Sequence, residues 1–202
     1  MCYRGNMLRF KAEVNLVLIY RTYIEHQNTL IFHLLLPSLE SQMPIGDDNE
    51  KEFSRAIVNW GKVELFNYCF ISTYHLWEKQ IGHIIRTQSI IPINISNNDF
   101  VKSIRRILED SFQINSIAEK VWNELEKARL IVNAFKHGPG KSLEEIRKIY
   151  PRIIVENKDN IHYSTLEIPE ELLKDLLNAL REFYNEVLNK TESDFSNWRK
   201  KQ

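Results

Sequence analysis

Helix-breaking residues are scarce in this chain of 202 residues, which contains only six glycines and six prolines. They gather in a few places, and the long stretches between them favour helices over a protein built from many short strands. The sequence has no low-complexity tract, and 43% of its residues are hydrophobic, which argues against disorder. We therefore expect one large domain that spans residues 1–202.

The sequence also has only two cysteines and no excess of either charge. The two cysteines, Cys2 and Cys69, cannot make a disulfide framework, which favours a reducing, cytoplasmic setting. Cys69 lies in an apolar run and is expected to be a small buried hydrophobe. The 27 basic and 27 acidic side chains give no net charge. Contact with nucleic acid would therefore depend on a local basic patch and not on a general attraction.

No hydrophobic run is long enough for a membrane helix, which needs about 20 apolar residues. The runs at 14–20 and 30–36 are much shorter, and the first lacks a signal-peptide cleavage site. No cofactor is expected. No metal site is expected either, because no two histidines stand four residues apart as in a helical zinc motif.

Hydrophobic periodicity predicts an all-α fold, an antiparallel bundle of four to five main helices. The expected helices cover residues 6–39, 50–87, 99–112, 115 or 116–137, 142 to before Pro151, and 170–190. Pro37 is expected to help end the first helix, Ser142 and Glu145 to form a capping box, and residues 191–202 to be a frayed tail. A small β-hairpin near 152–164 is expected to pair 153–155 with 161–163.

Apolar stripes indicate which helix faces should form the core. On the first helix the stripe consists of Leu16, Ile19, Tyr20, Tyr23, Ile24, Leu30, Ile31 and Leu34. On the second it consists of Phe53, Ile57, Trp60, Val63, Leu65, Phe66, Phe70, Tyr74, Trp77, Ile81 and Ile84. The last helix has the cleanest stripe, with Leu172, Leu173, Leu176, Leu177, Leu180, Phe183, Tyr184 and Val187. Gly61 and Gly82 are candidate points of close helix packing.

The segment 128–140 is the best candidate for chemistry. Asn133 and His137 are four residues apart and so share a helix face, where the amide could orient the imidazole. Near neutral pH an imidazole can take a proton from a hydroxyl and return one to a leaving group. Gly138 follows directly and, with Pro139 and Gly140, ends the helix.

This segment resembles the HEPN superfamily, whose signature is an arginine, four to six residues and a histidine, often written Arg-Asn-x-x-x-His-Gly. Asn133, His137 and Gly138 match it. The string from Asn133 to Ser142, followed by a terminal helix with Leu-x-x-Phe-Tyr at 180–184, is also similar to uncharacterised bacterial helical proteins. The resemblance implies a helical bundle, a homodimer, and in active members metal-independent cleavage of RNA. Many members act in toxin–antitoxin or anti-phage systems, and others are inactive.

The motif arginine does not stand in its usual place, because Val132 precedes Asn133. Arg129 is the nearest upstream cation, but it leaves seven residues before His137. Along a helix the two would be about 12 Å apart, with Arg129 leaning away from the histidine. Lys136 or a cation from a second subunit is an alternative, and Arg129 could instead form an ion pair with Glu126.

Two hypotheses for function follow. In the first, the chain is a HEPN-like ribonuclease in which His137 is the general acid and base, Asn133 orients it, and Arg129 stabilises the charged transition state. In the second, the chain is a non-catalytic protein that dimerises or binds a protein partner such as an antitoxin. His137 then only caps the helix end, and a tryptophan outside the core (Trp60, Trp77, Trp122 or Trp198) anchors the interface.

A second histidine suggests a supporting role near the site. His75 and Glu78 are three residues apart on the second long helix, so their side chains can meet. They are expected to form either a surface pair or an outer layer of a site.

Overall fold

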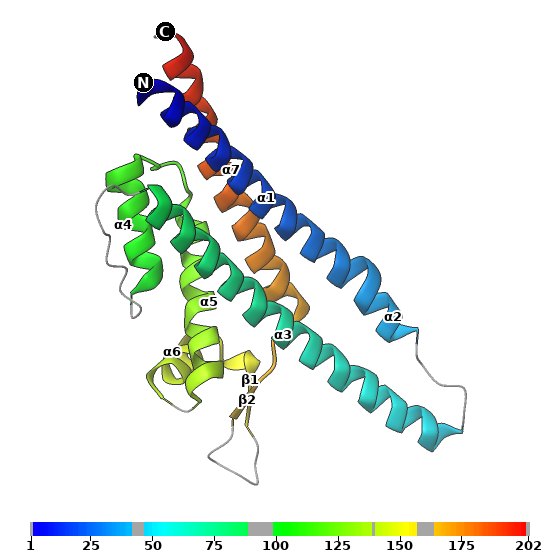
Figure 1. Cartoon of the computed structure of the whole chain (residues 1–202). Helices are drawn as coiled ribbons and strands as arrows, with labels where there is room; N and C mark the ends of the chain where they lie inside the picture. Colours follow the sequence, from blue (N-terminus) through cyan, green and yellow to red (C-terminus); the bar gives the residue numbers. More distant parts are fainter. Residues whose placement is uncertain (1, 42–46, 89–98, 139, 157–163, 201–202) are drawn as a thin grey trace.

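The computed structural model describes residues 2–41, 47–88, 99–138, 140–156 and 164–200. Its helices are α1 (Cys2–Thr29), η1 (Leu30–Leu35, π-helical), α2 (Leu36–Glu40), α3 (Asp48–Gln88), α4 (Phe100–Phe112), α5 (Glu119–His137), α6 (Lys141–Ile149), η2 (Pro151–Ile153, 3-10) and α7 (Glu170–Lys200). Two short strands, β1 (Ile154–Glu156) and β2 (Ser164–Leu166), complete the described elements (Figure 1). The expected all-α helical bundle is confirmed.

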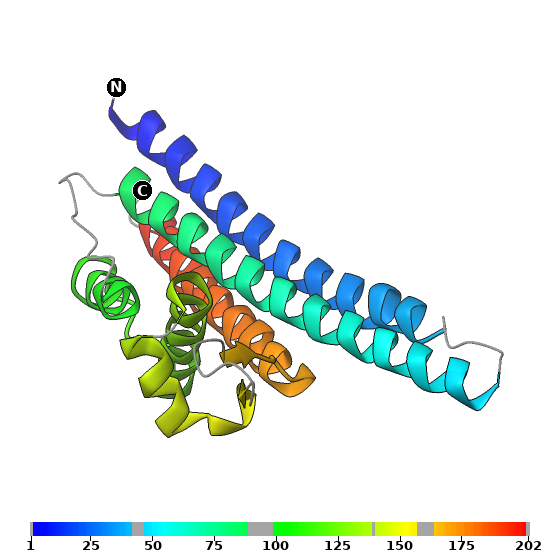
Figure 2. The ribbon, with the colours of Figure 1, turned by 90° about the horizontal axis from the view of Figure 1, so that it is seen from below.

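Three long helices form the frame. α1 lies beside α7, so the two ends of the chain are close together, and α3 runs along both (Figures 1 and 2). α5 packs on α7 and α3, and it is flanked by α4 and α6. None of the described helices is long and apolar enough to cross a membrane.

The core centres on α7, whose predicted stripe is buried in full. Phe183 meets Trp77 of α3 and Trp122 of α5 edge to face, with ring centroids 5.6 and 5.8 Å apart. Tyr184, next to it, donates a hydrogen bond of 2.6 Å to Gln80 Oε1 of α3. Because each large apolar side chain contributes about 1.5–3 kcal/mol when buried, this cluster is the main source of stability.

On α3 the predicted stripe is only half right. Phe66, Phe70, Tyr74, Trp77, Ile81 and Ile84 are buried. In contrast Phe53, Ile57 and Trp60 are 68%, 51% and 67% exposed. In both views α2 and the helical turns just before it run along one side of this first half of α3 (Figures 1 and 2). None of the described helices covers its outer face.

The stripe expected on the first helix is also too wide. The buried positions there are Val17, Ile24, Ile31 and Leu36, whereas Ile19, Tyr23, Leu30 and Leu34 are exposed. The first three of these buried positions are seven residues apart, which is the spacing of a narrow two-helix seam. Periodicity alone cannot tell such a seam from the broad face of a fully packed helix.

The first helical run ends at Glu40, within one residue of the expected end at 39. It passes through Pro37 because the π-helical turn before it shifts the bonding: Leu36 N–H donates to Ile31 O, five residues back. The end of the last helix differs from the expected one. α7 continues to Lys200 and not to about 190, since no glycine or proline interrupts it. The prediction that 191–202 forms a frayed tail was wrong for the described part.

Two helix starts also differ. α5 begins at Glu119 and not at 115 or 116, after Ala118 in an extended conformation. α6 begins at Lys141 with Gly140 as its N-cap, which places Ser142 inside the helix. The predicted capping box of Ser142 and Glu145 is therefore wrong, and the start of α6 has no side-chain cap.

Gly61 is a point of close packing, as expected. A Cβ atom there would lie 3.3 Å from Leu39 Cδ1, so α2 approaches α3 closely at a residue that has no side chain. Nearby, Lys62 Nζ bonds Glu40 Oε1 at 2.7 Å.

The hairpin joins β1 to β2 antiparallel, with Ile154 opposite Leu166. The predicted first strand is nearly right, whereas the predicted second strand, 161–163, lies outside the described residues. One buried side chain fixes the hairpin on α3: Asn67 Nδ2 donates to Leu166 O at 3.0 Å, and its Oδ1 accepts from Ile168 N–H at 2.9 Å. The amide thereby links α3 to the start of α7.

Replacing this amide should destabilise the fold. In Asn67→Ala, a buried carbonyl and a buried N–H lose their partner, which costs about 2–4 kcal/mol in the free energy of unfolding. Urea denaturation followed by circular dichroism measures this change. Asn123→Ala, at an exposed position of α5, is the matched control and should change stability by less than about 0.5 kcal/mol. Equal effects of the two substitutions would contradict the assigned role of Asn67.

Candidate functional site

The site is built at the C-terminal end of α5. Val121, Leu125, Ala128 and Val132 are among the buried residues that hold this helix in the core. Gly138 ends it with φ +65° and ψ −146°, and its N–H donates to Ala134 O at 2.9 Å. The positive φ is what a glycine provides, although this ψ differs from the left-handed helical turn that was expected.

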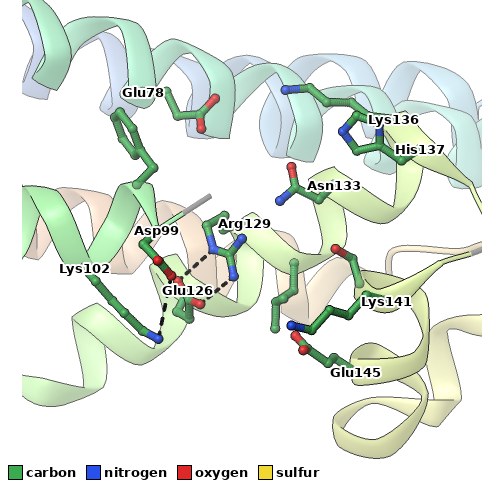
Figure 3. Close-up of a pocket in the computed structure, with 13 residues that line it drawn as sticks. Glu78, Asp99, Lys102, Glu126, Arg129, Asn133, Lys136, His137, Lys141 and Glu145 are labelled. Atoms are coloured by element: carbon green, nitrogen blue, oxygen red, sulfur yellow. Dashed lines mark hydrogen bonds and ion pairs between the residues drawn. The ribbon is translucent and has the colours of Figure 1, made fainter. Parts of the chain in front are cut away.

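A cavity of about 890 Å³ lies over this end of α5. It lies among α3, α4, α5 and α6, and most of its lining is charged or polar (Figure 3). The lining consists of Glu78, Asp99, Phe100, Lys102, Glu126, Arg129, Leu130, Asn133, Lys136, His137, Lys141, Ser142 and Glu145. Arg129, Asn133 and His137, the three residues singled out from the sequence, therefore share one cavity.

Asn133 and His137 lie along the same side of α5 (Figure 3). Asn133 is half-buried, whereas His137 is exposed to solvent. Among the described residues no hydrogen bond joins the amide to the imidazole. The exposed imidazole is therefore not held in place by the amide.

Arg129 is directed away from His137, as the lean of helical side chains predicts. It forms a two-point ion pair with Glu126, with Nε–Oε2 and Nη2–Oε1 distances of 2.9 and 2.7 Å. This is the Glu126 pair that the sequence suggested, and the carboxylate raises the pKa of Arg129. Asn133 lies between Arg129 and His137 in Figure 3, so the arginine and the histidine occupy different ends of the cavity.

Two lysines line the cavity together with His137. Lys136 directly precedes His137 on α5, whereas Lys141 begins α6, with its amine directed toward Glu145 in Figure 3; both lysines are exposed. The uncapped start of α6 adds its partial positive charge here. We call Asn133, Lys136, His137 and Lys141 the cationic end. The sequence pointed to Lys136, but Lys141 was missed; its place directly after Gly-Pro-Gly, at a helix start, was the available signal.

The other end of the cavity has more acids than bases. It combines Glu78 of α3, Asp99 before α4, and Glu126 of α5 with the cations Lys102 and Arg129. We call these five residues the acidic end. Glu78 Oε2 lies 2.8 Å from His75 Nδ1, so the expected His75–Glu78 pair forms. It is half-buried, and Glu78 also faces the cavity.

Tyr74 lies behind the acidic end with its hydroxyl buried. Its side chain is 1% exposed, and the hydroxyl makes no hydrogen bond of good geometry to the described residues. Burial raises the pKa of the Tyr74 hydroxyl, and the negative charge of Glu78 adds to this effect.

Family models, curated proteins and solved structures were compared with the chain, and none matched. The residues of the cavity and the 133–142 segment are therefore the features of the chain that bear on its function.

Two buried tyrosines allow a test of this geometry. Tyr74→Phe removes a hydroxyl without a partner, so the free energy of unfolding should stay the same or rise by up to about 1 kcal/mol. Tyr184→Phe breaks the bond to buried Gln80 and should lower it by about 1–3 kcal/mol. Urea denaturation of both variants measures the difference. A loss of stability in Tyr74→Phe as large as in Tyr184→Phe would mean that the Tyr74 hydroxyl is satisfied in solution.

Proposed function

We propose that this cavity is the active site of a HEPN-like, metal-independent endoribonuclease. The observation that carries the proposal is that Asn133, His137, Lys136 and Lys141 line one open cavity at the end of α5. Cleavage of RNA by its own 2′-hydroxyl uses a general acid–base group and cations that stabilise the charge on the phosphate, and this lining offers both. The resemblance to the HEPN superfamily suggests a role in a toxin–antitoxin or phage-defence system.

In the proposed reaction His137 takes the proton of the 2′-hydroxyl as the 2′-oxygen attacks the neighbouring phosphorus. The bond from phosphorus to the 5′-oxygen then breaks, and His137 returns a proton to that oxygen. The products are a 2′,3′-cyclic phosphate and a free 5′-hydroxyl. Lys136 and Lys141 stabilise the extra negative charge on the phosphate oxygens, and Asn133 orients the imidazole or donates to the phosphate.

Arg129 takes a lesser part in this proposal. Its guanidinium is bound to Glu126, and it lies at the other end of the cavity from His137. The role that the sequence assigned to it at the phosphate passes to the two lysines.

Cleavage of a mixed RNA substrate in buffer with a chelator tests the proposal. His137→Ala should lower the rate by about 10²- to 10⁴-fold, because general acid–base catalysis contributes that much. Lys141→Ala should lower the rate more than Arg129→Ala does.

The control variant is His83→Ala, at an exposed histidine of α3 outside the cavity, which should cleave at the wild-type rate. Equal cleavage by wild type and His137→Ala would rule out the assignment of the histidine. An absence of cleavage by the wild-type protein would leave the second candidate function below.

The second candidate is a protein that works by pairing helices. Among the described residues, all exposed large hydrophobics except Ile149 and Val155 lie on α1, η1 and α3. Phe53, Ile57, Trp60 and Tyr68 of α3 follow one another at helical spacing. We call these four residues the α3 stripe. Trp60 is the exposed tryptophan, since Trp77 and Trp122 are buried and the side chain of Trp198 is not among those described.

An exposed apolar stripe of this kind, interrupted by the exposed Glu64 between Trp60 and Tyr68, marks a surface for another protein. The proposed partner is a second copy of the chain, so that two α3 stripes pack against each other in a homodimer. This dimer is compatible with the ribonuclease as well as with a non-catalytic role. An antitoxin or other protein partner is the alternative occupant.

Light scattering after gel filtration tests the dimer. The wild type should have twice the mass of the 24.0-kDa chain, and Ile57→Glu should be a monomer because it places a charge in the stripe. Ile149→Glu is the matched control, since Ile149 is 57% exposed, against 51% for Ile57, but lies on α6. A monomeric wild type, or a dimer that survives Ile57→Glu, would exclude this surface.

A further inference from the structure

We infer that the acidic end of the cavity binds a guanine base, so that the protein cleaves or binds RNA next to a guanosine. This inference rests on the proposed function for its substrate class, RNA. Its own basis is the division of the cavity into two ends with different chemistry.

The two ends suit the two parts of a nucleotide. The cationic end presents two lysines and a histidine to a phosphate. At the acidic end, by contrast, Glu126 pairs with Arg129 and Asp99 lies 4.0 Å from Lys102. Glu78 is the carboxylate there without a lysine or arginine partner among the described residues, and it can accept hydrogen bonds. The cavity volume of about 890 Å³ lies within the usual range for small-ligand sites. A nucleotide would thus lie with its phosphate near His137 and its base near Glu78.

Glu78 is the carboxylate best placed to read a base. Glu126 is occupied by its two-point pair with Arg129, whereas Glu78 is held through Oε2 by His75 Nδ1 at 2.8 Å. An ionised carboxylate offers about four acceptor positions, so Glu78 keeps Oε1 and part of Oε2 for a ligand. His75 holds the carboxylate in place from the side away from the cavity lining.

Guanine is the RNA base whose Watson–Crick edge matches a carboxylate. It presents two neighbouring donors, N1–H and the N2 amino group, to which two carboxylate oxygens can bind. Adenine and cytosine each offer one amino donor beside an acceptor, and uracil offers one N–H between two acceptors. Single-stranded RNA is recognised on this edge. A fixed carboxylate therefore selects guanine, because each of the other bases would place an acceptor opposite a carboxylate oxygen and leave it without a hydrogen bond.

Other groups at the acidic end fit the rest of the base. Glu126 binds Nε and Nη2 of Arg129, which leaves Nη1 to donate to the guanine O6. Phe100 is half-buried in the cavity lining and held edge to face on Trp77, with centroids 5.7 Å apart, so its ring can stack on a base.

Calorimetric titration with nucleoside 3′-monophosphates tests the inference without requiring cleavage. The wild type should bind 3′-GMP with a dissociation constant lower by about tenfold or more than those of 3′-AMP, 3′-CMP and 3′-UMP. It should also bind 3′-IMP more weakly than 3′-GMP, because inosine lacks the N2 amino donor. The comparison of 3′-GMP with 3′-IMP uses the wild-type protein alone, so it does not depend on whether a variant folds.

Glu78→Gln should remove this selectivity, because the amide puts a donor where the second acceptor was. The variant should bind 3′-GMP and 3′-IMP equally well. Glu144→Gln, an exposed glutamate of α6 outside the cavity, is the matched control and should keep the wild-type preference. Equal binding of all five nucleotides, binding of none, or a preference that survives Glu78→Gln would overturn the inference.

Cleavage assays separate this inference from the proposed function. Cleavage of RNA without preference for guanosine would retain the ribonuclease and overturn the guanine site. Selective binding of 3′-GMP by a protein that leaves RNA intact would support the guanine site and count against the ribonuclease.

Discussion

The burial of the apolar stripe of α7 is the constraint on which the other elements depend. α1, α3 and α5 all pack on this helix, and the aromatic rings of Trp77, Trp122 and Phe183 meet there. Because α5 is held by α7 along its length, the end of α5 is fixed beside the second half of α3. The cavity thus lies on rigid helices, which hold side chains more precisely than loops do.

Sequence patterns predicted the elements best where a helix is covered on one broad face. The stripe of α7 was predicted residue by residue, because an apolar face of that width agrees with the helical period. The α3 stripe obeys the same period, yet Phe53 and Trp60 are exposed. Periodicity shows that a face is apolar, but only the tertiary arrangement decides whether the chain covers that face itself or leaves it for a partner.

The residues of the candidate site also differ in how well the sequence could predict them. Asn133 and His137 could be found from the sequence, because their spacing is local to one helix. Glu78 and Asp99 could not be placed beside them, since they come from α3 and the start of α4 and meet α5 only through the fold. The two-point pair of Arg129 with Glu126 was accessible from their three-residue spacing, and the lean of helical side chains gave its direction.

The ion pair of Arg129 with Glu126 limits which cations of the cavity can contact a phosphate near His137. For Arg129 to reach a phosphate at His137, it would have to give up two charge-assisted bonds, each worth about 1.5–3 kcal/mol. It would also leave Glu126 unpaired. Lys136 and Lys141 are exposed, so they can reach a phosphate without breaking a buried pair. The proposed ribonuclease therefore uses the lysines for the phosphate, and Arg129 stays with Glu126 at the other end of the cavity.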